Sequence, residues 1–312
     1  MMITTVSMNP CIDLTLFIDR LNQGASHRAK HYRQDISGKA VNVAYALQNL
    51  DVPCRVLGFD FIENGQLLKD SLLQAGVSYG YVSVPGAIRT NTKIFEEEQQ
   101  IMTEINQEGS MVSKDALESL LAKIDVDTGE VLVLSGSLPQ GVSPGVYAEI
   151  IRHSKAKGKI VILDAYGEAL RLGLEEGPNY IKPNRQELEQ TFNVSFNSHE
   201  ELIDFCLKLL QDKYGKQGLQ GICLSLGSEG AVMISHDEIY FAPALDIPVR
   251  GVQGAGDSMV AGLAIGLTKN ETPKEMLRSA VALAAASLVR EGSLMGTAEG
   301  FREMYDRVEI RQ

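Results

Sequence analysis

The chain has 312 residues, of which 44% are apolar and 22% are charged, and its formal net charge is −11. This composition is typical of a globular protein with a substantial core and excludes an intrinsically disordered chain. The negative charge argues against general affinity for nucleic acid or anionic membranes, so neither is expected as a partner.

No segment of the sequence indicates export or membrane insertion. The N-terminus lacks a basic stretch followed by a long apolar one, as a signal peptide would have. The longest nearly apolar run, Val281 to Val289, is too short to span a bilayer. The four cysteines are widely spaced and form no CxxC pair, which favours free thiols over disulfides or zinc ligands. We therefore expect a cytoplasmic protein.

Short β-rich segments alternate with helical patterns along most of the chain. In chain order we expect a strand at Ile3–Met8, a helix at Gly38–Leu50, a strand at Pro53–Phe59, a helix at Gly65–Ala75, a strand at Val131–Leu134, a helix at Pro144–Lys157, strands at Lys159–Leu163 and Tyr180–Ile181, helices at Asn184–Thr191 and Glu200–Tyr214 and a strand at Gly221–Ser225. Such alternation predicts parallel strands joined by crossover helices, in a three-layer α/β/α sandwich with a mostly parallel sheet.

Two regions depart from this alternation. Ile12–Ile18 with Ala29–Gln34, and Asn91–Glu97 with Gln100–Ile105, alternate polar and apolar residues and have no helix between them. They could extend the edge of the main sheet or form a small sheet of their own. We favour the second arrangement, a β lid built from about residues 11–37 and 88–106, because candidate ligand residues flank these segments.

The strongest local signal is the glycine-rich turn Gly251–Ser258, which leads into two predicted helices, Ala255–Thr268 and Pro273–Arg290. Glycines allow the backbone to turn tightly and to direct amides at an anion, and the positive end of the first helix adds to the effect. The turn therefore suits a phosphate group. Asp257 lies in the first helical turn and could accept the proton of an attacking hydroxyl, or it could be an ordinary helix cap.

Three weaker signals each have two interpretations. The turn Ser225–Gly230 could hold a nucleotide or simply connect two strands. Asn184 and Glu187, at i and i+3, could organise a magnesium ion or form a capping box. The cations Arg28, Lys39 and Arg89 lie near the lid segments and could bind an anion or be solvated surface charges. Neither a Walker A pattern nor GxGxxG is present, so the P-loop and dinucleotide-binding folds have no support.

Eight motifs occur in one order along nearly the whole chain. They are Asn9-Pro10 with Asp13, Gly38-Lys39 with Asn42-Val43-Ala44, Arg89 with Asn91 and Lys93, Thr103-Glu104-Ile105-Asn106, Ser135-Gly136-Ser137-Leu138-Pro139, Lys182-Pro183-Asn184 with Glu187, Ser225-Leu226-Gly227, and Gly254-Ala255-Gly256-Asp257-Ser258. In this arrangement the chain resembles the ribokinase-like (PfkB) carbohydrate kinases. It is most similar to their hexose-phosphate branch, the 1-phosphofructokinases and tagatose-6-phosphate kinases.

The resemblance implies a ribokinase-like fold across residues 1–312 as a single kinase domain, with ATP and Mg²⁺ as cofactors and a possible homodimer through the lid. It implies Asp257 as the catalytic base, with Gly254, Ala255 and Gly256 as the anion hole. The implied substrate-binding residues are Asp13, Arg28, Gly38, Lys39, Asn42, Arg89 and Ser137, of which the cations hold a phosphate already on the sugar. The implied nucleotide-binding residues are Lys182, Asn184, Ser225, Leu226, Gly227, Gly230 and Gly256, and Asn184 with Glu187 implies the magnesium site.

The expected reaction is the ATP-dependent conversion of fructose 1-phosphate to fructose 1,6-bisphosphate, which the stretch at 103–106 favours by resemblance. Ser37 and Ala40 replace glycines of the family motif, so tagatose 6-phosphate and fructose 6-phosphate stay open as substrates. A nucleoside or unphosphorylated-sugar kinase is a further alternative, against which the three cations argue. The last alternative is a non-catalytic sugar-phosphate sensor, which would need neither Asp257 nor a metal site.

Overall fold

A computed structural model describes residues 1–312 except for the side chain of Asp212. Its larger sheet has the strand order β13-β12-β11-β10-β9-β8-β1-β4-β5. These strands are β1 (Ile3–Ser7), β4 (Cys54–Phe61), β5 (Ser78–Val84), β8 (Val131–Ser135), β9 (Ile160–Asp164), β10 (Tyr180–Ile181), β11 (Gly221–Ser225), β12 (Ala231–Ser235) and β13 (Ile239–Ala242). Neighbours from β5 to β11 are parallel, and β12 and β13 are added antiparallel at the edge.

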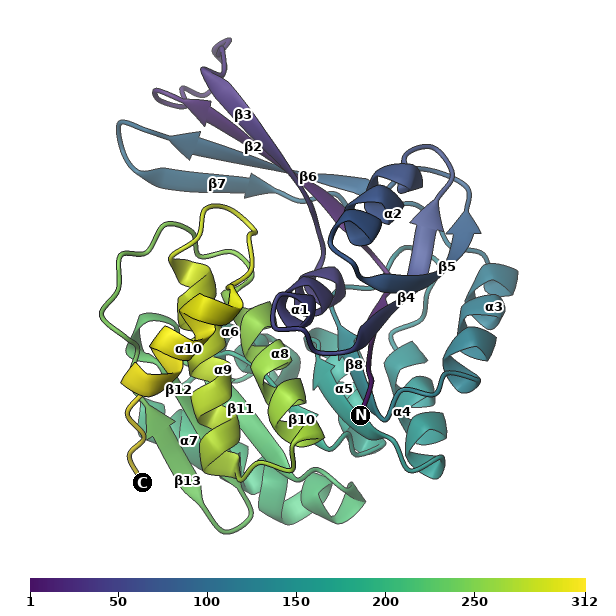
Figure 1. Ribbon diagram of the computed structural model, residues 1–312, viewed down its shortest axis with the longest axis vertical. Coiled ribbons are helices and arrows are strands. Elements are labelled where there is room, and N and C mark those ends of the chain that lie inside the picture. The colour runs from purple at the N-terminus through teal and green to yellow at the C-terminus, as the bar shows by residue number, and fades with distance from the viewer.

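Helices cover both faces of this sheet, as Figure 1 shows. They are α1 (Lys39–Gln48), α2 (Gly65–Gln74), α3 (Lys114–Asp125), α4 (Val146–Ala156), α5 (Gly167–Glu175), α6 (Arg185–Phe192), α7 (His199–Lys208), α8 (Ala255–Thr268), α9 (Pro273–Leu288) and α10 (Ala298–Arg307). Helix α8 packs between α1 and α9 on one face, while α3, α4, α5 and α6 form a row on the other. The expected three-layer α/β/α sandwich is thus confirmed.

The sheet has a buried core because its central strands are apolar on both faces. All five residues of β8, Val-Leu-Val-Leu-Ser, are buried, as expected for a parallel strand covered by helices on two sides. The close contact of α8 with α9 depends on Gly262, since a Cβ there would lie 2.5 Å from the Cα of Ala280. Tight packing in this region fixes the first turn of α8, where Asp257 lies.

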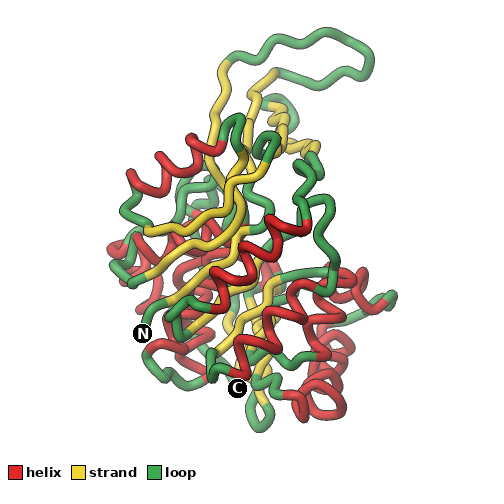
Figure 2. The backbone as a smooth tube through the Cα atoms, turned by 90° about the vertical axis from the view of Figure 1, so that its right-hand side faces the viewer, coloured by secondary structure: helices red, strands yellow, loops and turns green.

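A second sheet stands apart from the first, which confirms the predicted lid as a separate sheet. Its order is β3-β2-β6-β7, with β2 (Cys11–Ile18) parallel to β6 (Arg89–Glu96) and antiparallel to β3 (His31–Ser37), and with β7 (Ile101–Ile105) antiparallel to β6. Figure 2 shows these strands rising from the body, with the long loop between β2 and β3 at the top.

Several elements were not predicted, namely α3, α5, α10, β5, β12 and β13. Helix α10 has few apolar residues and begins at a threonine cap, Thr297, so no apolar run in the sequence indicates it. The predicted helix at Glu200–Tyr214 is α7 followed by a π-helical turn, Leu209–Tyr214, and short 3₁₀ turns lie at Gly215–Gln217 and Gly227–Glu229. Among the described residues, no helix is long and apolar enough to cross a membrane.

Candidate active site

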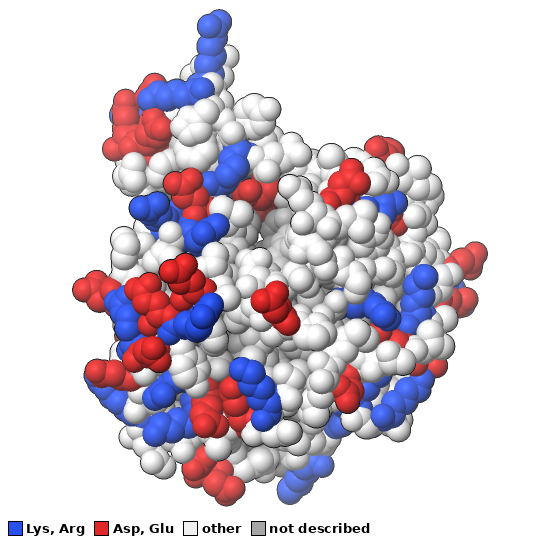
Figure 3. Space-filling model, viewed as in Figure 1, with Lys and Arg blue, Asp and Glu red and all other residues white. Residues whose placement is uncertain are grey.

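A cleft of about 1150 Å³ opens between the lid and the carboxyl ends of the parallel strands. Figure 3 shows the surface hollowed where the lid meets the body. The carboxyl end of a parallel sheet is where α/β proteins place their ligands. The cleft draws residues from β2, β6, α1, α8 and the loops after β8, β10 and β11. Most of the residues proposed from the sequence meet here, although they are far apart along the chain.

Asp257 lies in the first turn of α8 and is 7% exposed. Its Oδ2 accepts a hydrogen bond of 2.8 Å from Asn42 Nδ2. Gly254, the residue before the helix, has a φ of +75°, and a Cβ there would lie 2.3 Å from Met295 Cε. The turn therefore requires glycine at this position. It directs the first amides of α8, which have no partners within the helix, toward the cleft beside the Asp257 carboxylate.

Burial raises the pKa of Asp257 to about 6, which the nearby Lys39 ammonium partly opposes and the Asp164 carboxylate reinforces. At neutral pH the group is therefore ionised, yet it holds a proton more readily than an ordinary aspartate. A base with its pKa close to the working pH is well suited to proton transfer.

Asn42 connects Asp257 to the segment that contains Ser37 and Ala40, the two residues that replace glycines of the family motif. Its amide group exchanges hydrogen bonds of 3.2 and 3.3 Å with the buried Ser37 hydroxyl. The Ser37 side chain therefore holds Asn42 in place. Ala40 is buried on α1. Gly38, between them, has a φ of +129°, and a Cβ there would lie 3.1 Å from the Pro10 Cα.

Asp13, on β2, is held by several groups of the lid. Its carboxylate lies 3.0 Å from Lys93 Nζ and accepts hydrogen bonds from Asn91 Nδ2 at 3.1 Å and from the Cys11 thiol at 3.6 Å. All four side chains are buried and line the cleft. The carboxylate is thus fixed in orientation and placed on the side of the cleft that the lid covers.

The three cations proposed for one phosphate site are not brought together. Arg28 is exposed in the loop between β2 and β3 and does not line the cleft. Lys39 is paired with carboxylates near Asp257, as described below. Arg89 lines the cleft, and its guanidinium donates only to backbone carbonyls, those of Asn9 at 3.3 Å and Gln107 at 3.1 Å. Among the ion pairs of the described residues, none includes Arg89.

Ser137 lies in the loop after β8 and also lines the cleft. Its hydroxyl accepts a hydrogen bond of 3.2 Å from Asn9 Nδ2, which also donates to the carbonyl of Glu108 at 3.0 Å. Asn9 thus holds Ser137 near the segment that binds Arg89. This end of the cleft therefore carries the partly exposed Arg89 guanidinium, which has no carboxylate partner among the described residues, beside neutral polar groups.

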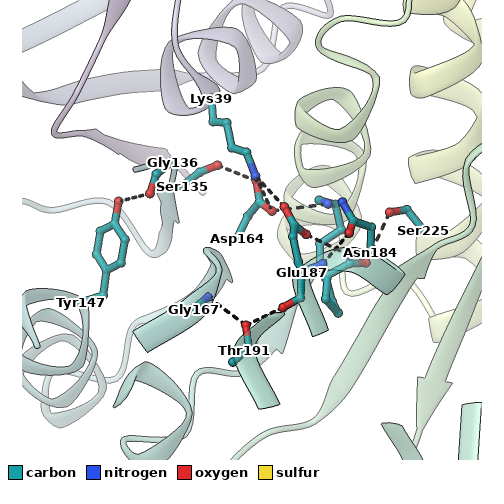
Figure 4. Close-up of polar contacts among 12 residues, drawn as sticks. Lys39, Ser135, Gly136, Tyr147, Asp164, Gly167, Asn184, Glu187, Thr191 and Ser225 are labelled. Carbon is teal, nitrogen blue, oxygen red and sulfur yellow. Dashed lines mark hydrogen bonds and ion pairs between the residues drawn. The ribbon is translucent and has the colours of Figure 1, made fainter. Parts of the chain in front are cut away.

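Lys39 extends from the start of α1 to two carboxylates, as Figure 4 shows. Its ammonium lies 3.3 Å from Asp164 and 3.2 Å from Glu187. Burial alone would lower the pKa of Lys39, but Asp164, Glu187 and Asp257 together hold it above its ordinary value. Burial would likewise raise the pKa of Asp164, but Lys182 and Lys39 hold it below its usual range. Asp164 therefore lies between two ammonium groups, those of Lys39 and Lys182, and Glu187 contacts the first of them.

Asn184 and Glu187 form a capping box at the start of α6. The Asn184 side chain accepts from the Glu187 amide at 2.8 Å, and Glu187 Oε2 accepts from the Asn184 amide at 2.9 Å. The capping interpretation of this pair is therefore correct. The capping box uses Oε2 of Glu187, and Oε1 accepts a hydrogen bond from Lys39 in the cleft. The pair is thus not limited to its capping role.

The opposite end of the cleft is less charged. Ser225, Gly227 and Gly230 line it, with Gly256 close to Lys182 Nζ, 3.6 Å from where its Cβ would be. Leu226 packs against the core and does not line the cleft. The turn connects β11 to the antiparallel β12, so the interpretation as a connection between strands is correct, while its role toward a nucleotide stays a prediction. Apolar side chains complete this end, namely Leu245, Ile247, Val249, Val281, Ala284, Ala285 and Leu288.

Asp164, Gln253 and Ser293 were missed from the sequence. Asp164 is the last residue of β9, and a carboxylate at the end of a parallel strand is a signal that could have identified it. Gln253 and Ser293 come from loops whose approach to the lid no local pattern indicates.

Comparison with known proteins agrees with this geometry. The model of the family described as pfkB family carbohydrate kinase matches residues 6–297. The chain is 33% identical to a 1-phosphofructokinase of Xanthomonas campestris, over 98% of this chain and 97% of that one. It is 30% identical to a tagatose-6-phosphate kinase of Staphylococcus epidermidis, over 99% of both. In structure it is similar to phosphofructokinase-2 from Escherichia coli, with a TM-score of 0.90, 23% identity and 98% of each chain covered.

Proposed function

The chain belongs to the pfkB family of carbohydrate kinases and is an ATP-dependent sugar-phosphate kinase with a ribokinase-like fold, and we propose that it converts fructose 1-phosphate to fructose 1,6-bisphosphate. The observation that carries this proposal is the position of two groups in one cleft. Asp257 lies buried beside the first amides of α8, and Arg89 lies in the same cleft without a carboxylate partner. A sugar with a hydroxyl at one end and a phosphate at the other suits both groups.

The reaction follows from the placement of Asp257. Its carboxylate accepts the proton of the sugar hydroxyl, the freed oxygen attacks the γ-phosphorus of ATP, and ADP leaves with the electron pair of the broken P–O bond. Asn42 fixes one carboxylate oxygen and leaves the other for the substrate. The amides of Gly254, Ala255 and Gly256 stabilise the negative charge on the transferred group. Lys39 stands beside the same region and adds a positive charge to it.

The sugar and its existing phosphate occupy the lid side of the cleft in this proposal. Asp13 and Asn42 bind hydroxyls, Gly38 allows close approach of the backbone, and Arg89 with Ser137 binds the phosphate. A guanidinium is well matched to a phosphate because it can donate two parallel hydrogen bonds. Lys39 points toward the other end of the cleft. We therefore assign it to the transferred phosphate and not to the phosphate already on the sugar.

The nucleotide occupies the other side, with its base against the apolar end of the cleft and its phosphates near Ser225, Gly227, Gly230, Lys182 and Asn184. The carboxylates of Asp164 and Glu187 lie beside the Lys39 ammonium, and Asp164 also lies beside Lys182, which supports placing positive charge in this region. Hard oxygen donors of this kind fit Mg²⁺, which is commonly bound by one or two carboxylates together with substrate phosphates. Glu187 and Asn184 would hold the ion, which would neutralise phosphate charge during transfer.

A panel assay of ADP release tests the proposal. We expect the highest kcat/KM with fructose 1-phosphate, and lower values with tagatose 6-phosphate and fructose 6-phosphate, which are the alternatives within the same class. The 1-phosphofructokinase and tagatose-6-phosphate kinase relatives are of similar identity, so the panel decides between these sugars. Equal or faster turnover of free fructose or of a nucleoside would contradict the phosphate-binding role of the cleft. Because ATP and these sugar phosphates are cytoplasmic metabolites, we place the enzyme in the cytoplasm.

We further propose that two copies associate through the lid. The face of the lid that points away from Asp13 carries Tyr32, Ile101 and Ile105, which are 68%, 47% and 59% exposed. An apolar sheet face of this kind suits a second copy of the chain. Arg28, in the exposed loop of the same lid, does not line the cleft of its own chain, so we propose that it reaches the cleft of the second copy. Sedimentation of wild type and Ile105→Glu would test this, with a dimer expected for the first and a monomer for the second.

A further inference from the structure

Gln253 and Ser293 connect the lid to the glycine turn. Gln253 directly precedes Gly254, and Ser293 lies in the loop between α9 and α10. Both line the cleft. The Ser293 hydroxyl lies 3.4 Å from Asp13 Oδ2 and 3.2 Å from Gln253 Oε1. One small hydroxyl therefore bridges the proposed sugar-binding carboxylate and the residue next to the anion hole.

The position of Ser293 is fixed by its surroundings. It is 8% exposed, and the glycine before it, Gly292, has a φ of +61°. The Arg33 guanidinium of the lid packs directly against this glycine, so that a Cβ on Gly292 would lie 2.3 Å from the guanidinium carbon. Arg33 is itself paired with Asp35 at 2.9 Å. The loop is thus held against the lid, and Ser293 has little freedom to leave the Asp13 carboxylate.

The chemistry of these groups leaves part of the Gln253 amide for a ligand. A serine hydroxyl carries one proton, so Ser293 can donate to Asp13 or to Gln253 but not to both at once. Whichever orientation the Gln253 amide takes, one of its two polar atoms faces Ser293. The other has no hydrogen-bond partner among the described residues. Because Gln253 is only partly buried and lines the cleft, that atom is open to a substrate.

We propose that Gln253 is a specificity-determining residue of the sugar site and that Ser293 positions it; this rests on the proposed function. The sugar must reach Asp257 at its reacting hydroxyl and Asp13 with another hydroxyl. Gln253 is connected to Asp13 through Ser293, and it directly precedes Gly254 in the turn that leads to Asp257. Its amide therefore contacts a secondary hydroxyl of the ketohexose between the reacting oxygen and the fixed phosphate, and it distinguishes the configuration of that carbon.

Epimeric ketohexose phosphates provide the direct test. Fructose and tagatose differ only in configuration at C4, and fructose and psicose only at C3. A fixed amide can meet the hydroxyl in one configuration and leaves a polar group unpaired in the other. A neutral hydrogen bond of this kind changes affinity by about two- to tenfold, and an unpaired buried group by more. We expect wild type to discriminate between at least one epimeric pair by about tenfold or more.

The experiment compares Gln253→Leu, Ser293→Ala and Ser293→Thr with wild type. The ratio of kcat/KM for the 1-phosphates of fructose, tagatose and psicose is measured, together with their dissociation constants by calorimetry without ATP. Gln253→Leu should reduce the ratio by about tenfold in both measurements and leave the KM for ATP unchanged. Ser293→Ala should also reduce this ratio of kcat/KM values. Ser293→Thr, which keeps the hydroxyl, should leave the ratio at the wild-type value. Gln140→Leu is the matched control, since Gln140 also lines the cleft but pairs with Glu108, and its ratio should equal that of wild type.

Two results would overturn the inference. An unchanged ratio in both Gln253→Leu and the milder Gln253→Asn, with normal thermal denaturation, would remove Gln253 from this role while leaving the proposed function intact. If wild type neither binds nor phosphorylates any of the sugar phosphates, the proposed function fails and the inference fails with it. The two failures are therefore distinguished by the wild-type measurement alone.

Discussion

Asn42 Nδ2 donates a hydrogen bond of 2.8 Å to Asp257 Oδ2, and this contact joins the first turns of α1 and α8. Both residues are buried, and Ser37 holds the Asn42 amide from behind. The carboxylate therefore has one defined orientation before any substrate arrives. Such preorganisation of a base is a large part of what an enzyme contributes to a transfer reaction.

The first prediction concerns Asp257 as the proposed base. Asp257→Asn should lower kcat by about 10²–10⁴-fold, because a positioned base typically contributes a factor of this size. The amide oxygen of the new side chain can still accept from Asn42, so the fold and the anion hole should persist. ATP binding, measured by calorimetry, should match that of wild type. Turnover within a few-fold of wild type would remove Asp257 from the role.

The second prediction follows from the raised pKa of Asp257, about 6 in the folded protein. An unfolded aspartate has a pKa of about 3.9, so the folded protein holds this proton more tightly than the unfolded chain does. The group therefore favours folding at low pH, and that stability is lost as the pH rises through about 6. At pH 7.5 Asp257→Asn should be more stable than wild type by up to about 3 kcal/mol, and the difference should shrink toward pH 4.

Thermal denaturation of both proteins across this pH range checks the sign. In parallel, kcat/KM of wild type should fall below about pH 6, because the base becomes protonated there. A stability difference that grows as the pH falls would contradict the raised pKa. A variant such as Asp115→Asn, on the exposed start of α3, serves as the control for general pH effects.

The sequence was informative where function depends on local pattern. The turn before Asp257 combines glycines, an acidic residue and an apolar helix within one short stretch, so a phosphate-binding turn could be proposed there without knowledge of the fold. The parallel strands were likewise predicted, because their apolar runs must be buried on both faces. The absence of helices between the lid strands left two arrangements open, and the separate sheet was favoured because candidate ligand residues flank these strands.

What could not be predicted depends on which side chains meet across the cleft. The sequence places Lys39, Arg28 and Arg89 near the lid segments, but only the fold shows that Lys39 turns toward Asp164 and Glu187 and that Arg28 lies in an exposed loop. Lys39 has a long, flexible side chain, and its direction is set by carboxylates from β9 and α6. No pattern near position 39 contains that information. Similarly, Gln253 and Ser293 become notable only because Ser293 contacts both Asp13 and Gln253.

The third prediction concerns magnesium. Activity should require the ion, and Glu187→Gln should shift the dependence on free Mg²⁺ to higher concentration while changing the KM for the sugar little. Glutamine preserves the capping box because it can still accept from the Asn184 amide, but it removes the negative charge that faces Lys39. The measurement is a titration of activity against free Mg²⁺, together with binding of the ion and ADP by calorimetry.

Glu275→Gln is the matched control for this experiment, because Thr272 and Glu275 form the same capping box on α9 and Glu275 does not line the cleft. It should leave the magnesium titration unchanged. Identical titration curves for Glu187→Gln and wild type would restrict Glu187 to its capping role.

The last prediction concerns the phosphate that the substrate already carries. Arg89 is held in place by the carbonyls of Asn9 and Gln107 and has no carboxylate partner among the described residues, so its charge is available to an anion. A charge-assisted contact with phosphate is worth about 1.5–3 kcal/mol. Arg89→Ala should therefore raise the KM for the sugar phosphate by about ten- to a hundredfold, since 1.4 kcal/mol corresponds to about tenfold. The KM for ATP should change little, because the nucleotide is assigned to the other end of the cleft.

Arg171→Ala, an exposed arginine on α5, is the control and should leave both constants unchanged. Wild type should prefer the phosphorylated sugar to its free form, and this preference should decrease in Arg89→Ala and with added salt, which screens the charge near the cleft mouth. If Arg89→Ala keeps both the preference and the KM of wild type, the phosphate must be bound elsewhere, and the exposed Arg28 of a second copy becomes the residue to test.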